Sequence, residues 1–403
     1  MTATGPCNAL DGFGGPDVVD VVTLGESMVT FLPSTSGRLA DVPSFDRAIG
    51  GAESNVACTL AAAGHSVRWV SRVGADGFGD HLVEAVGAYG VDVTAVRRDP
   101  ARQTGIYFRT AGDRATDAHE VAYYRAGSAA SAMAVGNTDL DAVRAGRVLH
   151  LSGITAALSE ECLGLMRELT APRAGRPLVS FDVNYRAGLW PDTDGAAVLL
   201  GLASRADVVF VGEDEAQEAW GIAGGPAAVR AALPEPAVLV VKQGARGATV
   251  FEHDAAGSHP AQPAGSRAAG AAPDPKRGGT PPAPGRASHP RPAPTQSTFV
   301  PALTVDVVSA IGAGDAFAAG FLSATLRALP VRDRLRHGHL TAAAALTAPG
   351  DLAAPPARDH ADRLAALDDD AWGRLRLGPG WTQADDHAVE RAVDRAEEEV
   401  RTP

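Results

Sequence analysis

The run GAGDAF at residues 312–317 has the composition of a site that binds an anion and moves a proton. Apolar residues recur at helical spacing after it, which predicts a buried helix beginning near Asp315. Gly312, Ala313 and Gly314 let a ligand approach the backbone, and the helix N-terminus offers free N–H groups to an anion. Such a site can stabilise a phosphoryl group in transfer while the Asp315 carboxylate accepts a hydroxyl proton. The alternative is that Asp315 merely caps the helix, and this run alone leaves both open.

A second glycine-rich segment, GGAESNVA at residues 50–57, precedes another predicted helix. Its main-chain N–H groups near Gly51 and the Asn55 amide can bind a small polar ligand. A Gly-Gly turn followed by a helix cap explains the same segment without a ligand.

Polar residues follow two predicted buried strands, as DVNYRAGLW at residues 182–190 and GEDE at residues 212–215. Ligands of open α/β sheets bind outside the carboxyl ends of the strands. Arg186 is therefore a candidate to bind a carboxylate, and the acidic end that includes Glu215 suits a hydrated Mg²⁺. A surface arginine and an acidic first helical turn are the alternatives that need no ligand.

The elements that must position these residues alternate along the chain. Runs typical of buried parallel strands are separated by stretches with helical spacing, and they lie at residues 18–24, 68–73, 148–151, 177–182, 207–211, 237–242 and 248–251. This alternation predicts a doubly wound, mainly parallel α/β sheet. Residues 30–47 and 104–125 interrupt it with short β-prone pieces, which predict a small second sheet or surface hairpins.

The predicted domain consists of residues 18–253 and 299–360, preceded by a flexible tail at 1–17. Residues 254–298 hold ten of the 28 prolines and almost no large apolar side chains, so we expect a disordered insertion. Residues 361–403 are expected to form a C-terminal extension, with helical spacing at 384–400.

Composition narrows the class of protein further. A net charge of −12 argues against a nucleic-acid partner. Three cysteines without paired spacing, no signal-like N-terminus and no apolar run of about 18 residues indicate a cytoplasmic protein with no membrane span. The P-loop, dinucleotide-binding and common hydrolase motifs are absent from the sequence.

Together, the motifs resemble those of the ribokinase-like (PfkB) carbohydrate kinases. Four features coincide in order: a strand ending in Gly25-Glu26, GGAESNVA, SRVGADGFGD at 71–80, and GAGDAFAAGF at 312–321. The resemblance implies a three-layer α/β/α domain with a small β-sheet lid, and ATP with Mg²⁺ as co-substrate. It also implies that Gly312, Ala313 and Gly314 form an anion hole beside the catalytic base Asp315. The segment KQGARG would bind the nucleotide through Lys242, Gly244 and Gly247.

Within the family the sequence is most similar to 2-keto-3-deoxygluconate kinases. The shared features are the Tyr-x-Arg of the lid, a YYRxGSAAS-like run at 123–131, and an Asn-Tyr-Arg-x-x-Leu-Trp stretch at 184–190. This resemblance implies phosphorylation of the sugar acid to its 6-phosphate, with the substrate bound by Gly51, Asn55, Tyr107, Arg109 and Arg186. A substrate carboxylate would suit the two arginines, since guanidinium groups pair with carboxylates through two parallel bonds.

The sequence departs from the family pattern at two positions. Ser309 replaces an aspartate that helps to hold a monovalent cation in relatives, so dependence on such a cation is in doubt. Gly212 replaces an asparagine near the magnesium site, while Glu215, expected to act through water, is kept. These departures leave open a non-catalytic sugar- or nucleotide-binding protein. A separate alternative is a kinase for a neutral sugar such as fructose, which would offer Arg109 and Arg186 no anionic partner. Pairing of lid sheets in the family also suggests a homodimer.

Overall fold

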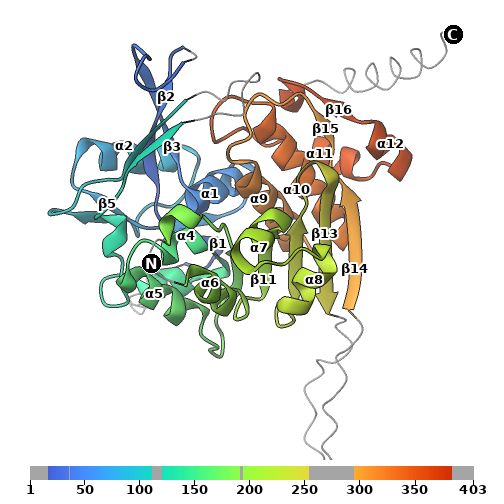
Figure 1. Cartoon of the computed structure of the whole chain (residues 1–403), viewed down its shortest axis with the longest axis horizontal. Helices are drawn as coiled ribbons and strands as arrows, with labels where there is room; N and C mark the ends of the chain where they lie inside the picture. Colours follow the sequence, from blue (N-terminus) through green and yellow to red (C-terminus); the bar gives the residue numbers. More distant parts are fainter. Residues whose placement is uncertain (1–16, 36, 111–119, 191–193, 254–294, 384–403) are drawn as a thin grey trace, which may run out of the picture.

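The computed structural model describes residues 17–35, 37–110, 120–190, 194–253 and 295–383. Its centre is an eight-stranded sheet in the order β14-β13-β12-β11-β10-β9-β1-β4 (Figure 1). The strands are β1 (Val19–Leu24), β4 (Val67–Val70), β9 (Gly146–Ser152), β10 (Leu178–Asp182), β11 (Val208–Gly212), β12 (Val238–Lys242), β13 (Gly247–His253) and β14 (Thr295–Pro301). The six strands from β4 to β12 pair in parallel, and β13 and β14 pair antiparallel.

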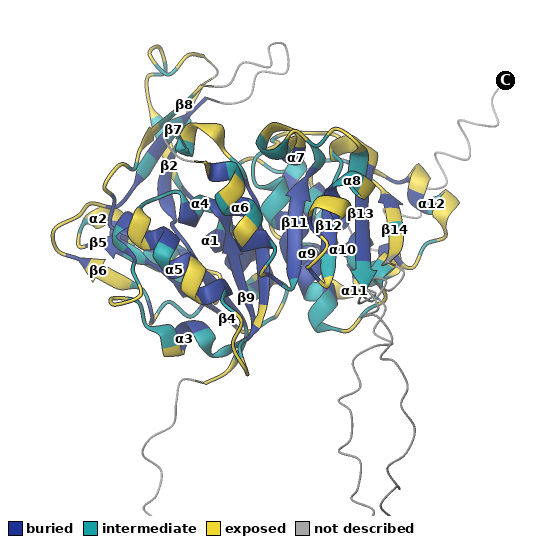
Figure 2. Ribbon diagram, turned by 60° about the horizontal axis from the view of Figure 1, so that its bottom comes forward, coloured by how far each residue is buried: buried dark blue, intermediate teal, exposed yellow. Residues whose placement is uncertain are grey.

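Helices cover both faces of this sheet. Consecutive side chains of a strand point to opposite faces, so Val208 and Phe210 join one hydrophobic core while Val209 and Val211 join the other. The first core is covered by α1 (Ala52–Ala62), α2 (Gly77–Ala88), α9 (Ala313–Leu326), α10 (Val331–Leu346) and α11 (Arg358–Ala365). The second is covered by α3 (Leu140–Arg144), α4 (Gly153–Ala156), α5 (Glu160–Thr170), α6 (Gly195–Ala203), α7 (Glu213–Trp220) and α8 (Gly225–Ala232). Strands buried between two helical layers are visible in Figure 2, and the three-layer prediction is confirmed.

A separate four-stranded sheet forms the lid, in the order β3-β2-β7-β8. Its strands are β2 (Met28–Pro33), β3 (Phe45–Gly50), β7 (Ile106–Arg109) and β8 (Val121–Tyr124). In β7, Tyr107 and Arg109 are buried toward the main domain. Phe108 points to the opposite face, where it stacks on Phe31 with ring centroids 4.6 Å apart. The lid therefore has one polar face over the cavity and one aromatic face, which contacts the start of α2 through Phe31 and Phe78.

The C-terminal residues differ from the sequence expectation. Trp372 in α12 (Asp369–Arg374) and Trp381 are buried in the same core as α9 and α10. Strand β16 (Arg376–Leu377) pairs in parallel with β15 (Thr304–Val305). Residues 361–383 are therefore built into the domain by burial of large aromatic side chains, and the structure places the beginning of the expected extension inside it.

Strand β14 begins at Thr295, four residues before the expected return to regular structure at Phe299, because Thr295 pairs with His253 of β13. The tail at 1–16, the segment 254–294 and the predicted helix at 384–400 lie outside the described residues. No described helix is long and apolar enough to cross a membrane.

Candidate active site

Helix α9 begins with a glycine that no other residue can replace without strain. Gly312 is the N-cap, with φ of 78°, and a Cβ atom there would lie 2.2 Å from the Asp351 carbonyl oxygen. Ala313 and Gly314 follow as the first two helical residues, so Asp315 is the third residue of α9 and not its N-cap. The first-turn amides of α9 therefore have no side-chain cap and remain available to an anion.

The Asp315 carboxylate links two segments that are distant in sequence. Asn55 Nδ2 donates a hydrogen bond of 2.9 Å to Asp315 Oδ2, which connects α1 to α9 across 260 residues. Burial raises the pKa of Asp315 to about 8, and the nearby Asp182 carboxylate adds to this effect, while Asn55 and Lys242 act in the opposite direction. A carboxyl group with such a pKa can accept a proton and return it near neutral pH.

A second buried carboxylate fixes α1 to the sheet. Glu53 Oε1 accepts hydrogen bonds from the hydroxyl groups of Ser152 and Thr155, both at 2.8 Å, at the carboxyl end of β9. Burial raises the pKa of Glu53. Sequence reasoning did not identify this carboxylate, which holds the helix that presents Asn55.

Lys242, at the end of β12, supplies a fixed positive charge beside α9. Its Nζ lies 3.1 Å from both carboxylate oxygens of Asp182 and would be 3.6 Å from a Cβ atom on Gly314. Burial alone would lower the pKa of Lys242, but the carboxylates of Asp182 and Glu215 outweigh it and the pKa is raised. The ammonium group therefore stays charged next to the helix N-terminus.

A cavity of about 530 Å³ lies between the lid and the carboxyl ends of the strands. Ten of the site residues predicted from the sequence line this cavity: Gly51, Asn55, Tyr107, Arg109, Arg186, Glu215, Lys242, Gly312, Gly314 and Asp315. It also contains polar residues that were not predicted as site residues: Glu26, Arg125, Asp182, Asn184 and Asp351.

The two predicted arginines lie in different electrostatic environments. Arg109 Nη2 donates to Asp351 Oδ1 at 2.8 Å, and the Tyr107 hydroxyl donates to Asp351 Oδ2 at 2.6 Å. The positive charge of Arg109 is therefore already balanced by the Asp351 carboxylate. Arg186 is exposed at the cavity and has no carboxylate within ion-pair distance in the described residues. Asp351 follows Pro349-Gly350 as an isolated acidic residue, and no pattern in the sequence identified it as a site residue.

Another ion pair joins the lid to β1. The Arg125 guanidinium pairs with Glu26, which also accepts a 2.5 Å hydrogen bond from Ser128. The Gly25-Glu26 ending of β1 is part of the motif found in the sequence, but its partner in the lid could not be read from it.

Several polar atoms of this cavity have no hydrogen-bond partner among the described residues. They are the amide oxygens of Asn55 and Asn184 and the Nε atoms of Arg109 and Arg125. Asn184 also adopts a left-handed conformation with φ of 41°. Because more than about 90% of buried polar groups in folded proteins are satisfied, this cluster indicates a ligand with several hydroxyl or carboxylate groups.

A second cavity of about 370 Å³ adjoins the first and shares Lys242 and Gly314 with it. It contains the remaining predicted residues Gly244, Gly247 and Ala313, and its walls are largely apolar, with Leu303, Val305, Phe317 and Leu346. Gly247 has φ of 140°, and a Cβ there would lie 2.2 Å from the Val300 carbonyl oxygen. An apolar slot that opens onto a helix N-terminus suits a purine base attached to phosphates.

Glu215 lies in the first cavity, at the start of α7. Its Oε2 accepts a 2.8 Å hydrogen bond from the Gly212 backbone N–H, and burial raises its pKa. In the part of the chain that the structure describes, no group of three or more His, Cys, Asp or Glu side chains could hold a metal ion. Any magnesium ion here would take most of its ligands from phosphates and water.

Comparison with known proteins identifies the family to which this chain belongs. Residues 19–266 and 293–358 match the pfkB family carbohydrate kinases, and the chain belongs to this family. It is 32% identical to a 2-dehydro-3-deoxygluconokinase of Bacillus subtilis (strain 168), over 85% of this chain and 94% of that protein. It is 28% identical to a probable chloroplastic fructokinase of Arabidopsis thaliana, over 75% of this chain and 69% of that protein.

Solved structures agree with the fold. An uncharacterized sugar kinase from Pyrococcus horikoshii, determined in complex with ATP, superposes with a TM-score of 0.66 at 21% identity, over 84% of this chain and 96% of that one. The protein is thus an ATP-dependent sugar kinase, as the sequence predicted.

Proposed function

We propose that the protein phosphorylates 2-keto-3-deoxygluconate to its 6-phosphate. The observation that supports this substrate is Arg186, a guanidinium group at the sugar cavity with no carboxylate partner in the described residues. The cavity oxygens of Asn55 and Asn184 provide acceptors for sugar hydroxyl groups. Gly51 and Tyr107 complete the polar wall.

In the proposed reaction, the acceptor hydroxyl lies next to Asp315 and its oxygen attacks the γ-phosphorus of ATP. A bond forms between the sugar oxygen and phosphorus, the bond from phosphorus to the β–γ bridging oxygen breaks, and the hydroxyl proton moves to Asp315. The N-terminal amides of α9 and the Lys242 ammonium group stabilise the negative charge on the transferring phosphoryl group. Asn55 orients the Asp315 carboxylate through its 2.9 Å hydrogen bond.

ATP would place its base in the apolar cavity near Gly244 and Gly247, with its phosphates toward Lys242. Magnesium would be held by those phosphates and, through water, by Glu215, and it would neutralise phosphate charge. Ser309 presents a hydroxyl group where the family has a carboxylate, so the proposal includes no requirement for a monovalent cation.

A coupled assay for ADP formation tests the substrate. The assignment predicts that kcat/KM for 2-keto-3-deoxygluconate exceeds that for fructose by at least about tenfold, since fructose offers Arg186 no anionic group. Fructokinases are among the relatives, so a preference for fructose would replace the sugar-acid assignment by the neutral-sugar alternative.

The proposal extends to a cytoplasmic homodimer. ATP consumption fits a cytoplasmic location, and the lid carries an aromatic cluster that is partly exposed. Phe31, Phe45 and Tyr124 each contact Phe108 there, and Phe31 also contacts Phe78 of α2. Tyr124 is 64% exposed. Exposed apolar patches of this kind often bind a second subunit. Light scattering should give twice the chain mass for the wild type and the single chain mass for Phe108→Asp; a monomeric wild type would contradict the dimer.

A further inference from the structure

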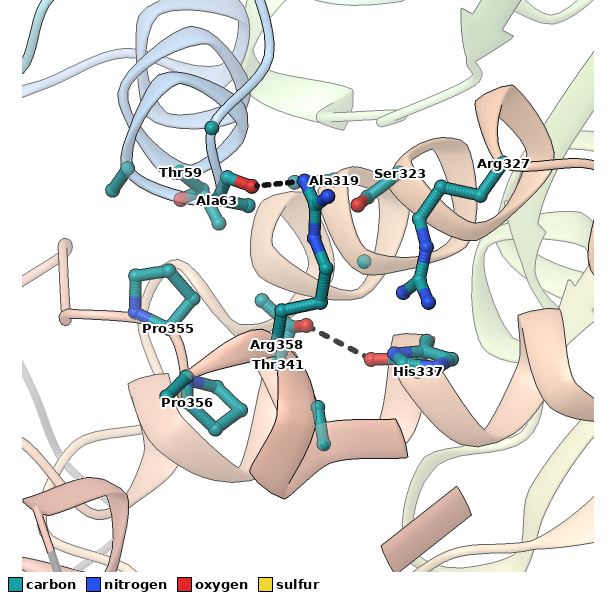
Figure 3. Close-up of a pocket in the computed structure, with 15 residues that line it drawn as sticks. Thr59, Ala63, Ala319, Ser323, Arg327, His337, Thr341, Pro355, Pro356 and Arg358 are labelled. Atoms are coloured by element: carbon teal, nitrogen blue, oxygen red, sulfur yellow. Dashed lines mark hydrogen bonds between the residues drawn. The ribbon is translucent and has the colours of Figure 1, made fainter. Parts of the chain in front are cut away.

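A third cavity, of about 370 Å³, lies outside the two cavities of the proposed active site and shares no residue with them. Its walls come from the C-terminal half of α1, the middle and end of α9, α10, and the N-terminus of α11 (Figure 3). The proposed reaction uses none of these residues. Its volume lies within the range of small-molecule sites.

The cavity is lined by cationic and hydroxyl-bearing side chains. Figure 3 shows Arg358 extending toward Ala63, where its Nη2 donates a 3.0 Å hydrogen bond to the carbonyl oxygen, and Arg327 extending toward His337. Arg327 pairs with Asp362 at 2.6 Å. Arg358, by contrast, has no carboxylate within ion-pair distance in the described residues. One guanidinium group at this cavity therefore lacks a counter-ion.

A buried threonine on α1 has a hydroxyl group that is accessible from the same cavity. Thr59 is only 6% exposed, and its side chain makes no hydrogen bond within the described part of the chain. Ser323, on the facing helix, bonds to the His65 ring at 2.8 Å. Because the Thr59 hydroxyl group reaches the cavity, it can bond to a polar ligand there.

The start of α11 contributes a third feature. Its N-cap is Ala357, preceded by Pro355-Pro356, and no side chain caps the helix. These residues line the cavity together with Arg358. Free N–H groups at a helix N-terminus favour an anion, and here they lie beside an arginine without a counter-ion.

We propose that this cavity is an effector site for a small molecule bearing a phosphate group, bound by Arg358, Thr59 and the N-terminus of α11. A phosphate group offers enough acceptor oxygens for the guanidinium, hydroxyl and amide donors together. The cavity is larger than inorganic phosphate needs, so a phosphorylated metabolite of a few carbon atoms fits the same chemistry.

The site is connected to the proposed catalytic residues through two helices. Thr59 lies one turn after Asn55 on α1, and Ala319 and Ser323 lie one and two turns after Asp315 on α9. Eight residues of helix place Ser323 about 12 Å from Asp315. Because Asn55 and Asp315 hydrogen-bond between these two helices, a ligand that fixes α1 against α9 also acts on the catalytic carboxylate.

The test is a calorimetric titration with inorganic phosphate and, separately, glycerol 3-phosphate, at ionic strength matched with chloride and with a non-hydrolysable ATP analogue present. Wild type should bind, and Arg358→Gln should weaken binding by about tenfold or more. Thr59→Val, which keeps the shape of the side chain, should also weaken it. Arg374→Gln, an exposed arginine of α12 that does not line the cavity, should bind like wild type.

The second measurement is the rate of ADP formation with saturating substrates. Phosphate or glycerol 3-phosphate should change kcat of the wild type at least about twofold, and Arg358→Gln should keep its basal kcat but lose this response. Equal binding by wild type and Arg358→Gln would overturn the site, and binding with no change in kcat would overturn the effector role. Tighter binding of glycerol 3-phosphate identifies a phosphorylated metabolite, and tighter binding of inorganic phosphate identifies the free anion. Since binding is measured directly, the result does not depend on which sugar is phosphorylated.

Discussion

Three properties of Asp315 fit the proposed role of general base: a position at the N-terminus of α9, a fixed orientation and a shifted pKa. Gly312 takes the N-cap position, Asn55 holds one carboxylate oxygen at 2.9 Å, and burial raises the pKa to about 8. Its position as the third residue of α9 frees the side chain from a capping role.

Replacing Asp315 by Asn should therefore lower kcat by at least about 100-fold with little change in substrate affinity, since acid–base catalysis contributes roughly that much. The matched control is Asp333→Asn, because Asp333 is likewise the third residue of its helix, α10. The control should retain its turnover. A wild-type kcat for Asp315→Asn would exclude the general base.

The raised pKa of Asp315 also predicts a pH dependence of rate and of stability. Because the base must be ionised, kcat/KM should fall as pH drops below about 8, and Asn55→Ala should move this limb to higher pH by removing a donor to the carboxylate. The neutral form is favoured in the folded state, so its stabilisation is present below pH 3.8 and is lost as pH rises to about 8. Melting curves should show Asp315→Asn gaining stability relative to wild type between pH 5 and pH 8, and no such gain would contradict the shift.

Arg186 is the residue that tests the charge of the substrate. Arg186→Ala should lower kcat/KM for 2-keto-3-deoxygluconate by about 10- to 150-fold, since a charge-assisted hydrogen bond contributes about 1.5–3 kcal/mol. Turnover of a neutral hexose should fall much less. Arg173→Ala, at an exposed arginine before β10, is the control. Equal losses for both substrates would show that Arg186 does not bind the carboxylate.

At the scale of elements, the lid is held over the cavity by ion pairs from different parts of the chain. Arg109 of β7 pairs with Asp351 after α10, and Arg125 after β8 pairs with Glu26 after β1. The side chains of Arg109 and Asp351 are 6% and 4% exposed, so neither charge is solvated if the other is removed.

Asp351→Asn should therefore destabilise the protein by about 3–5 kcal/mol, because it leaves Arg109 buried without a counter-charge. The double variant Arg109→Gln/Asp351→Asn should recover part of this loss, which a denaturant-unfolding double-mutant cycle measures. Strict additivity of the two single changes would show that the pair is not coupled.

In the molecule as a whole, the edge of the main sheet is formed by two strands that are separated by residues 254–294. Strand β14 pairs with β13 in a continuous antiparallel register from His253–Thr295 to Gly247–Pro301. The two strands could thus be joined directly, as an ordinary hairpin.

Joining His253 to Thr295 through a short Gly-Ser linker should leave fold and activity intact, because loop-closure free energy changes by only about 0.6 kcal/mol per doubling of length. Joining His253 to Phe299 instead, at the boundary expected from sequence, would remove four residues of β14 that pair with β13 and should destabilise the sheet edge. Thermal melting and ADP formation measure both. Loss of activity in the first deletion would show that residues 254–294 are required.

Local patterns in the chain were enough to predict the family, the alternating strands and helices, and the thirteen proposed site residues. These features leave local signals: glycines where a backbone must turn or approach a ligand, as at Gly312 and Gly247, and apolar periodicity where a strand or helix is buried. The pairing of the charged side chains, by contrast, could be read only from the folded arrangement. Asp351 lies 242 residues from Arg109, and Glu53 lies 99 residues from Ser152, and no local pattern marks either pair. The ion pairs depend on how the sheet, the lid and the loop after α10 meet. In this arrangement Asp351 neutralises Arg109, and Arg186 remains available to a substrate.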